Sequence, residues 1–457
     1  MRQETARTAH AELRAVLRLA APIVAVQVGL NAMGVVDVAM LGHYRGDALA
    51  AMSLGHVIVW GALVFCMGVL VAVDPLLSQA VGAGDDAAVA RTLLRGGWLA
   101  VLLTAPAVLL LLPAETWLGL LGQERELAAT AGAYARISAW GVLPFLWFQV
   151  ARSYTAAHAR LRAQVTVIVV ANLVNVGLDW ALVFGRAGFP ELGVAGAAWA
   201  TVACRWLMCV GLLALAWRDI GPHVARLRDA TVRAQVLALA PIQRLLRLGL
   251  PIGVQFSLEM GIFALTALLI GWFGAAELAG HQVALQFASM SFMVPLGLSM
   301  ATAVRVGWAI GRADMVAARR VARVALLTGG AVMSAFMIVF LALPSRLAGL
   351  LSDVPEVVAW AALLIPVAAV FQVVDGLQVV AIGCLRGLGD TRTPMVVNVV
   401  GFWLVGLPIG CGLAFGLGQG PPGLWWGLCA GLSAVACALL WMVRRGFARD
   451  RARLTEQ

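Results

Sequence analysis

The chain has 457 residues, of which 62% are hydrophobic and only 12% are charged, with a formal net charge of +10. Soluble globular domains carry about 25% charged residues, so this composition excludes a soluble protein and indicates one that lies in a bilayer. Every basic residue is an arginine, because the sequence contains no lysine.

Apolar runs recur along the whole chain, and each is long enough to cross a hydrocarbon core about 30 Å thick as a helix. In chain order they predict transmembrane helices near 19–41, 49–80, 93–113, 128–151, 163–184, 193–216, 247–273, 277–309, 321–343, 356–384, 393–415 and 423–443. The predicted fold class is therefore an all-α polytopic membrane protein with twelve transmembrane helices.

The arginines are distributed unequally between the predicted loops. If both termini are cytoplasmic, 27 of the 33 arginines fall on the inner side, and the outer loops hold only Arg45, Arg125, Arg186 and Arg346. This is the positive-inside pattern, so the basic charge sets the membrane topology. We therefore expect a multi-pass protein with cytoplasmic termini and no nucleic-acid partner.

An internal repeat divides the chain into two halves. A shift of 229 positions aligns some seventy residues without a gap. The matched pairs include Pro22 with Pro251, Gly68 with Gly297, Asp85 with Asp314 and Arg91 with Arg320. We expect a six-helix lobe at 1–216, an arginine-rich cytoplasmic linker at 217–246, a second six-helix lobe at 247–443 and a cytoplasmic tail at 444–457. Both lobes enter the membrane in the same orientation, as in parallel-repeat transporters, although channels and some membrane enzymes are duplicated too.

Two acidic residues fall near the midplane of the second half, where a charge is costly and marks a candidate functional site. Glu259 lies in the stretch "PIGVQFSLEMGIFALTALLIGWFG", which contains no other ionisable residue. It follows Arg247 by twelve residues, and Asp375 precedes Arg386 by eleven. At about 1.5 Å per residue both acids lie about 16–18 Å deep, so they are expected to meet.

Polar side chains accompany these acids on three predicted helices. They are Gln255 on the helix of Glu259, Gln372 and Gln378 on the helix of Asp375, and Gln282, Gln286 and Ser289 on the helix between them. We expect this group to line a polar cavity. Two carboxylates at low dielectric constant cannot both be ionised and unpaired, so a proton or Na⁺ should bind there. The alternative is a pair of buried acids that neighbouring polar groups satisfy without any exchange.

The first half has an acidic cluster of its own, about 10 Å from the outer face. Asn175 and Asp179 share one face of a predicted helix, which Thr201 on the next helix can reach, and Asp37 lies at the same depth. Met33, on the face of Asp37, offers a soft surface to apolar ligands. The alternative is a shallow site that is merely hydrated.

Two other intramembrane residues have less certain roles. Asp74 precedes Pro75, which is typical of a helix N-cap followed by a helix restart, so we interpret Asp74 as structural. Arg205 either pairs with an acid or extends to the membrane surface, and the sequence does not decide between them. The seven cysteines and six histidines show no metal-ligand spacing, and no nucleophile–base pair is visible, so we expect neither an enzyme nor a resident cofactor.

The sequence resembles the multidrug and toxic compound extrusion (MATE) family, in particular its NorM-type branch. The resemblance is carried by "MGVVDVAMLG" (33–42), "LVNVGLDWALVFGRAGFPELGVAGAAWAT" (173–201), "EMGIFALTALL" (259–269), "AGHQVALQF" (279–287), "VRVGWAIG" (304–311) and "FQVVDGLQVVAIGCLRGLGDTRTPM" (371–395). It implies a V-shaped pair of six-helix lobes that exchange H⁺ or Na⁺ for cationic amphiphilic drugs. It also implies a cation site at Glu259 and Asp375, and a first-lobe cluster of Asp37, Asn175, Asp179 and Thr201.

We therefore hypothesise a secondary-active multidrug antiporter of the bacterial inner membrane, which works as a monomer without a cofactor. The sequence does not distinguish Na⁺ from H⁺, because both bind carboxylates and polar oxygens. The nearest rival is a lipid-linked oligosaccharide flippase of the same superfamily, which should line its cavity with basic residues. An intramembrane enzyme and a non-transporting scaffold are more distant alternatives.

Overall fold

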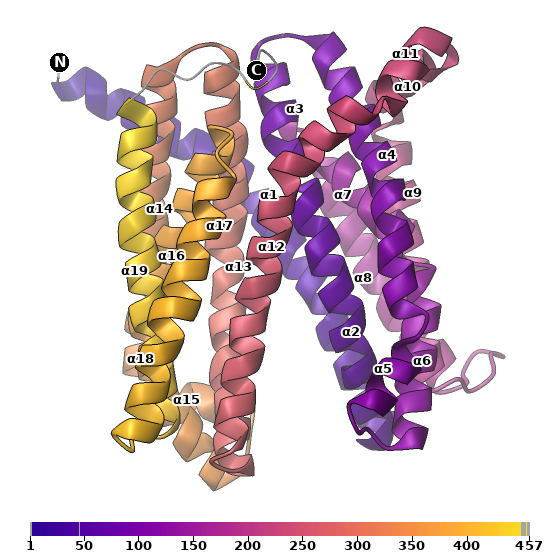
Figure 1. Ribbon diagram of the computed structural model, residues 1–457, viewed down its shortest axis with the longest axis vertical. Coiled ribbons are helices and arrows are strands. Elements are labelled where there is room, and N and C mark those ends of the chain that lie inside the picture. Colours follow the sequence, from indigo (N-terminus) through magenta and orange to yellow (C-terminus); the bar gives the residue numbers. More distant parts are fainter. Residues whose placement is uncertain (1, 45, 449–453, 455–457) are drawn as a thin grey trace. The chain divides into compact units, whose positions relative to one another are not determined.

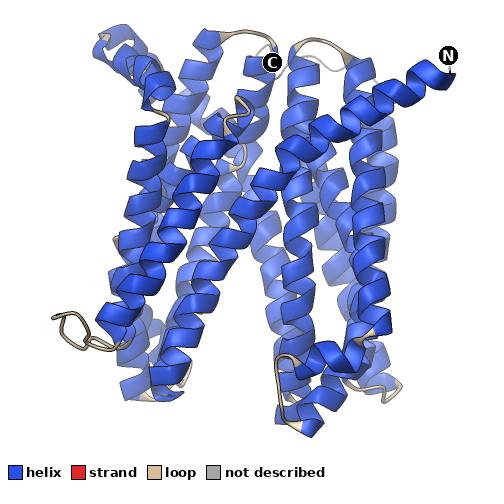
Figure 2. Ribbon diagram, turned by 180° about the vertical axis from the view of Figure 1, so that it is seen from behind, coloured by secondary structure: helices blue, strands red, loops and turns tan. Residues whose placement is uncertain are grey.

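The computed structural model describes residues 2–44, 46–448 and 454, so Arg45 and most of the predicted tail lie outside the described residues. Within them the chain is helical, with short connecting loops and no strand (Figure 2). The first-half helices are α1 (Arg2–Tyr44), α2 (Gly46–Leu70), α3 (Val73–Gly82), α4 (Asp86–Leu111), α5 (Ala114–Leu120), α6 (Arg125–Ala139), α7 (Val142–Ala157), α8 (Leu161–Val183) and α9 (Val194–Leu215). The connection holds α10 (Trp217–Ala225), η1 (Arg226–Arg228) and α11 (Ala230–Leu237). The second-half helices are α12 (Leu239–Gly271), α13 (Ala275–Gly311), α14 (Met315–Ala342), α15 (Pro344–Gly349), α16 (Pro355–Gly387), α17 (Arg392–Val399), η2 (Val400–Gly406), α18 (Leu407–Cys411), η3 (Gly412–Gly416) and α19 (Pro421–Ala448).

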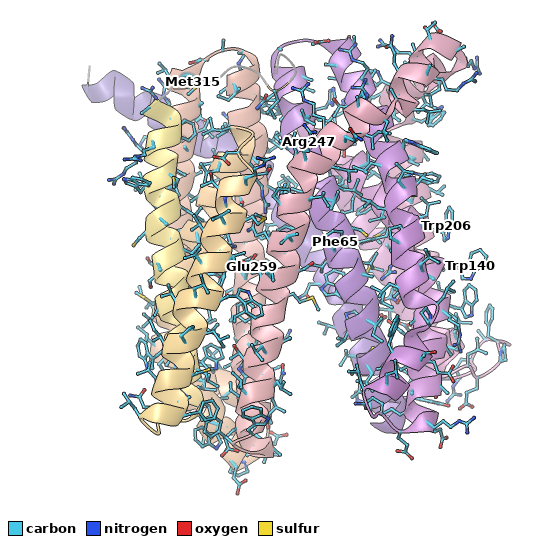
Figure 3. The ribbon with its side chains drawn as sticks, viewed as in Figure 1. Phe65, Trp140, Trp206, Arg247, Glu259 and Met315 are labelled. Carbon is cyan, nitrogen blue, oxygen red and sulfur yellow. The ribbon has the colours of Figure 1, made fainter. Side chains whose placement is uncertain are left out.

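Among the described residues, eleven helices are long and apolar enough to cross a membrane. The predicted span at 128–151 is built differently, from the two shorter helices α6 and α7, which meet at Trp140 and Gly141. Trp140 is 70% exposed at this break and points away from the helices around it (Figure 3). With this interrupted span counted as one, the predicted twelve-helix, all-α fold class is confirmed.

The chain forms two compact units, of which unit 1 comprises residues 1–24 and 254–457 and unit 2 comprises residues 25–253. Each unit contains five complete spans, and α1 and α12 are each divided between the two units. The two crossing points, after residues 24 and 253, are 229 residues apart, which is the offset of the sequence repeat. The units therefore differ from the expected lobes, because the first 24 residues join unit 1 and the linker region 217–246 belongs to unit 2.

Glycines let helices pack closely beside both crossing points. A β-carbon added to Gly68 on α2 would lie 2.6 Å from Cα of Gly253 on α12, within unit 2. In unit 1, a β-carbon on Gly297 of α13 would lie 2.9 Å from Cα of Val24 on α1. The two glycines and their two partners are related by the repeat, and small residues are what membrane helices need for such close contact. The repeat in the sequence is thus a repeat in packing.

Two helix starts are also related by the sequence repeat. Asp85 caps α4 by accepting a hydrogen bond from the backbone N–H of Ala88 at 2.8 Å. Asp314, its counterpart, caps α14 by accepting from the N–H of Ala317 at 2.9 Å. An aspartate at this position satisfies a backbone donor that a helix start leaves free, so both turns end one span and begin the next in the same way.

In unit 1, α16 packs against α13, α14 and α19, and the four helices lie side by side in Figures 1 and 2. A β-carbon on Gly383 would lie 2.3 Å from the carbonyl oxygen of Ser299 on α13, and one on Gly376 would lie 2.4 Å from Cγ of Met333 on α14. Because Gly376 follows Asp375, this close packing on both sides fixes the position of that acid.

Candidate functional site

The first candidate site lies in unit 1, around Glu259 on α12 and Asp375 on α16. Figure 3 shows Glu259 about midway along α12, which is the part of that helix that belongs to unit 1. Nε2 of Gln378 donates a hydrogen bond to Oε1 of Glu259 at 3.4 Å, and Asp375 lies close enough for the two carboxylates to repel each other. The structure therefore brings the two predicted acids together, with Gln378 beside them.

Arg386 is a further member of this site, which the sequence analysis places in an inner loop. In the structure α16 continues to Gly387 and leaves Arg386 only 8% exposed. Its Nη2 donates to Oε1 of Gln255 at 3.4 Å, and its guanidinium lies 5.0 Å from the ring centroid of Phe256. Its charge acts on Glu259. α16 thus supplies the basic neighbour that the sequence around Glu259 lacks.

The other residues predicted to line a cavity divide into two groups. Gln255 and Gln372 are buried, and Nε2 of Gln372 donates to Oγ of Ser291 on α13. On α13, Gln282 is exposed, and Gln286 and Ser289 are half-buried. Among the described residues, none of these three is hydrogen-bonded to the acidic pair. The sequence analysis missed Ser291, which lies two positions from Ser289 and hence on a different face of the helix.

The second candidate site lies in unit 2, where three helices converge on Asp37. Nδ2 of Asn175 on α8 donates to one carboxylate oxygen of Asp37 at 3.1 Å, and Oγ1 of Thr201 on α9 donates to the other at 2.8 Å. Asp37 is 4% exposed, and Met33, one turn earlier on α1, is also buried. The structure brings the predicted cluster together, and each oxygen of Asp37 has its own donor.

Asp179 lies beside Asp37 and is completely buried. Neither of its carboxylate oxygens has a hydrogen-bond partner in the part of the chain that the structure describes. An unpaired buried carboxylate is costly, and two adjacent ones cannot both stay ionised without a proton or a cation. The alternative of a merely hydrated site does not fit two acids that the protein encloses this fully.

Arg205 contributes a positive charge to the same cluster. It is 7% exposed, its guanidinium lies 5.4 Å from the ring centroid of Phe145, and its charge interacts with that of Asp37. Its Nη1 has no acceptor among the described residues. Arg205 therefore stays inside unit 2 instead of extending to the surface.

The sequence model of the family described as MatE matches residues 22–181 and 251–411. The chain belongs to the MatE family. The two matched segments begin at Pro22 and Pro251, which the repeat also pairs, so family and repeat divide the chain alike. The resemblance to the NorM-type branch is confirmed by the relatives described next.

Two curated relatives cover almost the whole chain. The "Probable multidrug resistance protein NorM" of Mesorhizobium japonicum is 38% identical over 96% of this chain and 94% of its own length. The protein of that name in Rhizobium meliloti is 37% identical over 94% and 92%. A solved structure, the Vibrio cholerae MATE transporter VcmN in the bent form, matches with a TM-score of 0.82 at 20% identity, covering 97% and 98%. None of these names is that of an enzyme, in agreement with the sequence analysis.

A third acid of this MatE protein also faces a buried arginine. Asp74 lies in the first turn of α3, whose N-cap is Ala72, so the predicted capping role is wrong. Its charge acts on Arg152 of α7, which is 7% exposed and donates to Oε1 of Gln27. When the "FQV" stretches at 148–150 and 371–373 are aligned, Arg152 takes the place of Asp375. The two halves therefore carry opposite charges at this matched position.

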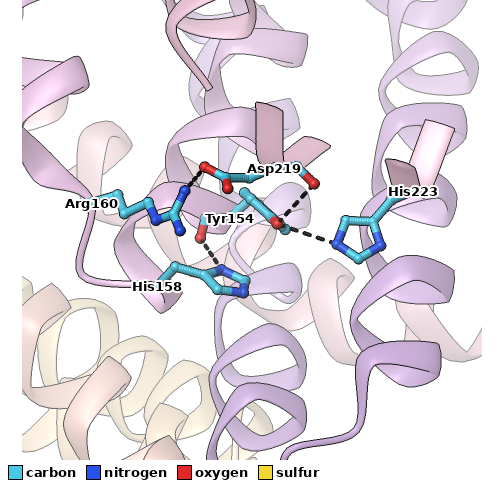
Figure 4. A network of polar contacts seen from close by, with 5 residues as sticks. All are labelled: Tyr154, His158, Arg160, Asp219 and His223. Carbon is cyan, nitrogen blue, oxygen red and sulfur yellow. Dashed lines mark hydrogen bonds and ion pairs between the residues drawn. The ribbon is translucent and has the colours of Figure 1, made fainter. Parts of the chain in front are cut away.

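A further polar network joins the end of α7 to α10, and is shown in Figure 4. The hydroxyl of Tyr154 donates to the backbone oxygen of Asp219 at 3.4 Å and lies 3.2 Å from Nε2 of His223. Nδ1 of His158 lies 2.9 Å from the backbone oxygen of Tyr154, and Arg160 forms an ion pair with Asp219. Burial, and then the charge of nearby Arg226, lower the pKa of His223 below its usual value.

Proposed function

We propose that this protein is a secondary-active multidrug exporter, which exchanges H⁺ or Na⁺ for cationic amphiphilic compounds by alternating access. The names of its relatives support multidrug export. The observation that carries the exchange mechanism is the pairing of Glu259 with Asp375 beside Arg386. We place the protein in the bacterial inner membrane with both termini in the cytoplasm, which the arginine distribution supports.

The charges at the unit 1 site define what it can bind. Arg386 compensates one of the two carboxylates, so one negative charge is left within a low-dielectric span. A single proton, Na⁺ or monovalent organic cation neutralises that charge. The three compete because they neutralise the same negative charge. The site in unit 2 has a similar composition, since Asp37 and Asp179 are adjacent and the charge of Arg205 acts on Asp37. Each unit therefore offers one uncompensated negative charge.

Competition at such a site couples the two fluxes. Binding of the coupling ion from outside lowers the affinity for the organic cation, which then leaves on the side where the ion is abundant. A membrane potential of 100 mV supplies about 2.3 kcal/mol for each charge moved inward. One coupling ion can therefore support a concentration gradient of about fiftyfold. No resident cofactor is needed, and a monomer is sufficient, because each unit holds its own site.

The rival function, flipping of a lipid-linked oligosaccharide, calls for uncompensated positive charge in the cavity. The described structure has three buried arginines, Arg152, Arg205 and Arg386. Each of them acts on an acid, namely Asp74, Asp37 and Glu259 respectively. This compensation leaves no net positive charge for a pyrophosphate, and favours cation exchange.

The acid pair is tested by transport of ethidium into everted membrane vesicles, in which export from the cytoplasmic face is measured as uptake. Glu259→Gln and Asp375→Asn each remove one negative charge with little change in shape, and each is expected to abolish gradient-driven efflux while the protein still inserts. Gln286→Glu, a polar position on α13 outside the acid pair, serves as a charge-adding control. Intact efflux in both neutral variants would show that the mechanism is wrong.

A further inference from the structure

A cavity of about 340 Å³ lies in unit 2 at the turn between α5 and α6. These two helices pack against each other at the lower end of the unit in Figure 1. The arginine distribution predicts this end on the outer side of the membrane. The volume falls within the range of about 300–1,000 Å³ that small-molecule sites span. No residue of either acidic cluster belongs to the lining, so the cavity is a separate site.

An ion pair belongs to the lining of this cavity. Nη1 of Arg136 on α6 lies 3.1 Å from Oε2 of Glu115 on α5. A β-carbon added to Gly132, one turn before Arg136, would lie 2.7 Å from Cβ of Glu115, so the close packing of the two helices fixes the position of this carboxylate. The ion pair uses Oε2, and Oε1 of Glu115 accepts no hydrogen bond from the described residues. Oε1 therefore stays available to a donor on a ligand.

Arg125 supplies a second positive charge to the lining. It is the first residue of α6, and its exposed side chain forms no hydrogen bond or ion pair within the described part of the chain. Glu124 and Glu126 flank it in the sequence, but neither belongs to the lining. The lining thus holds two arginines and one carboxylate, with Thr116 and Gln123 as further polar groups. One positive charge is left over, which favours a ligand that carries a negatively charged group.

Exposed apolar side chains lie next to this polar lining. Leu112 belongs to the lining itself, and Leu120 and Leu121, at the end of α5, are each 75% exposed. Trp117 on α5 is also exposed, and its indole N–H donates to the backbone oxygen of Leu110 at 3.2 Å. Exposed leucine and tryptophan beside arginine are characteristic of a segment that lies in the membrane interface. A ligand with a polar headgroup and an apolar tail fits both surfaces.

We propose that this cavity binds the headgroup of a phospholipid whose phosphate is followed by hydrogen-bond donors, as in phosphatidylethanolamine. Arg125 binds the phosphate oxygens through its paired N–H donors, and the ammonium group of the lipid donates to Oε1 of Glu115. The acyl chains lie against the exposed leucines. A choline headgroup has no N–H, so it lacks the contact with Glu115. The site lies outside both acidic clusters, and lipid binding there is independent of the proposed cation exchange.

Binding is measured with the purified full-length protein in detergent micelles by native mass spectrometry. The probes are phosphatidylethanolamine and phosphatidylcholine of equal chain length, which have the same net charge and differ in the donors of the headgroup. The parent protein is expected to bind phosphatidylethanolamine about fivefold more tightly. Arg125→Gln should weaken binding of both lipids about fivefold, and Glu115→Ala should remove the preference between them. Arg186→Gln, which removes an exposed arginine outside the cavity on the same expected side, is the matched control and should bind as the parent does.

A second arm uses soluble glycerophosphoethanolamine to test whether the acyl chains contribute. Tighter binding of the lipid than of this soluble headgroup supports a lipid site, and equal binding of the two would overturn it. Equal binding of both lipids by the parent, or unchanged lipid binding by Arg125→Gln, would also overturn the proposal. Should Glu115→Ala not fold, Arg125→Gln alone decides, because the exposed side chain of Arg125 forms no hydrogen bond or ion pair with the described residues.

Discussion

Arg386→Gln removes the fixed positive charge beside Glu259, and the structure sets the size of the effect. Nη2 of Arg386 lies 3.4 Å from Oε1 of Gln255, which is one helical turn before Glu259, so the charge and the carboxylate lie about 6–8 Å apart. At an effective dielectric constant of about 20, this separation corresponds to about 2–3 kcal/mol. Without Arg386 the site should bind a monovalent cation about 30–100 times more tightly. Solvent screening favours the lower end of that range, because Glu259 is half-buried.

The assay is equilibrium binding of ethidium to the purified protein, followed by fluorescence and repeated with increasing Na⁺ and at several pH values. Tighter ethidium binding is expected together with slower release, so efflux by Arg386→Gln should fall although its affinity rises. Arg386→Lys keeps the charge and serves as the control, with an affinity within about threefold of the parent. If Arg386→Gln binds ethidium no more tightly than Arg386→Lys does, the compensating role of Arg386 is refuted.

Three further predictions follow from other contacts. Thr201→Val removes the 2.8 Å hydrogen bond to Asp37 and should lower efflux severalfold. The free energy of unfolding, measured by denaturation in detergent, should fall by only about 1–2 kcal/mol. Gly383→Val places a side chain where a β-carbon alone would lie 2.3 Å from the oxygen of Ser299, so the variant should unfold at a markedly lower temperature, whereas an unchanged unfolding temperature would contradict the close packing of α16 on α13. The pKa of His223 is lowered in the folded protein, so the unfolded chain binds a proton at this residue more readily. The free energy of unfolding should therefore fall as the pH drops below about 6.5. His223→Gln should flatten that decline in the unfolding temperature, and an equally steep decline would refute the assignment.

Much of the fold could be predicted from the sequence because its signals are local and occur twice. The glycines and aspartates of the repeat recur at a fixed offset, and the structure uses Gly68 and Gly297, or Asp85 and Asp314, for the same contacts. The interrupted span was not predicted, since α6 and α7 together have the length and apolar character of one helix. The break at Trp140 and Gly141 depends on how that helix packs.

The acidic clusters could be predicted in part, because helical spacing shows which residues share a face. Helical spacing places Asn175 and Asp179 on one face, and Thr201 lies on the next predicted helix, within reach of that face. Arg386 was missed because the positive-inside rule assigns an arginine near a helix end to the loop, and the sequence does not show that α16 continues past it. Ser291 was missed because a difference of two positions turns the side chain to another face of the helix.

The central claim is that cation binding at Glu259 and Asp375 drives export, and separately imposed ion gradients test it most directly. Ethidium efflux is measured in proteoliposomes with an inward Na⁺ gradient at constant pH, and then with a pH gradient in the absence of Na⁺. The account predicts that at least one gradient drives efflux, and that Glu259→Gln and Asp375→Asn abolish the response to that gradient. Efflux that neither gradient accelerates, or that both variants retain in full, would contradict it.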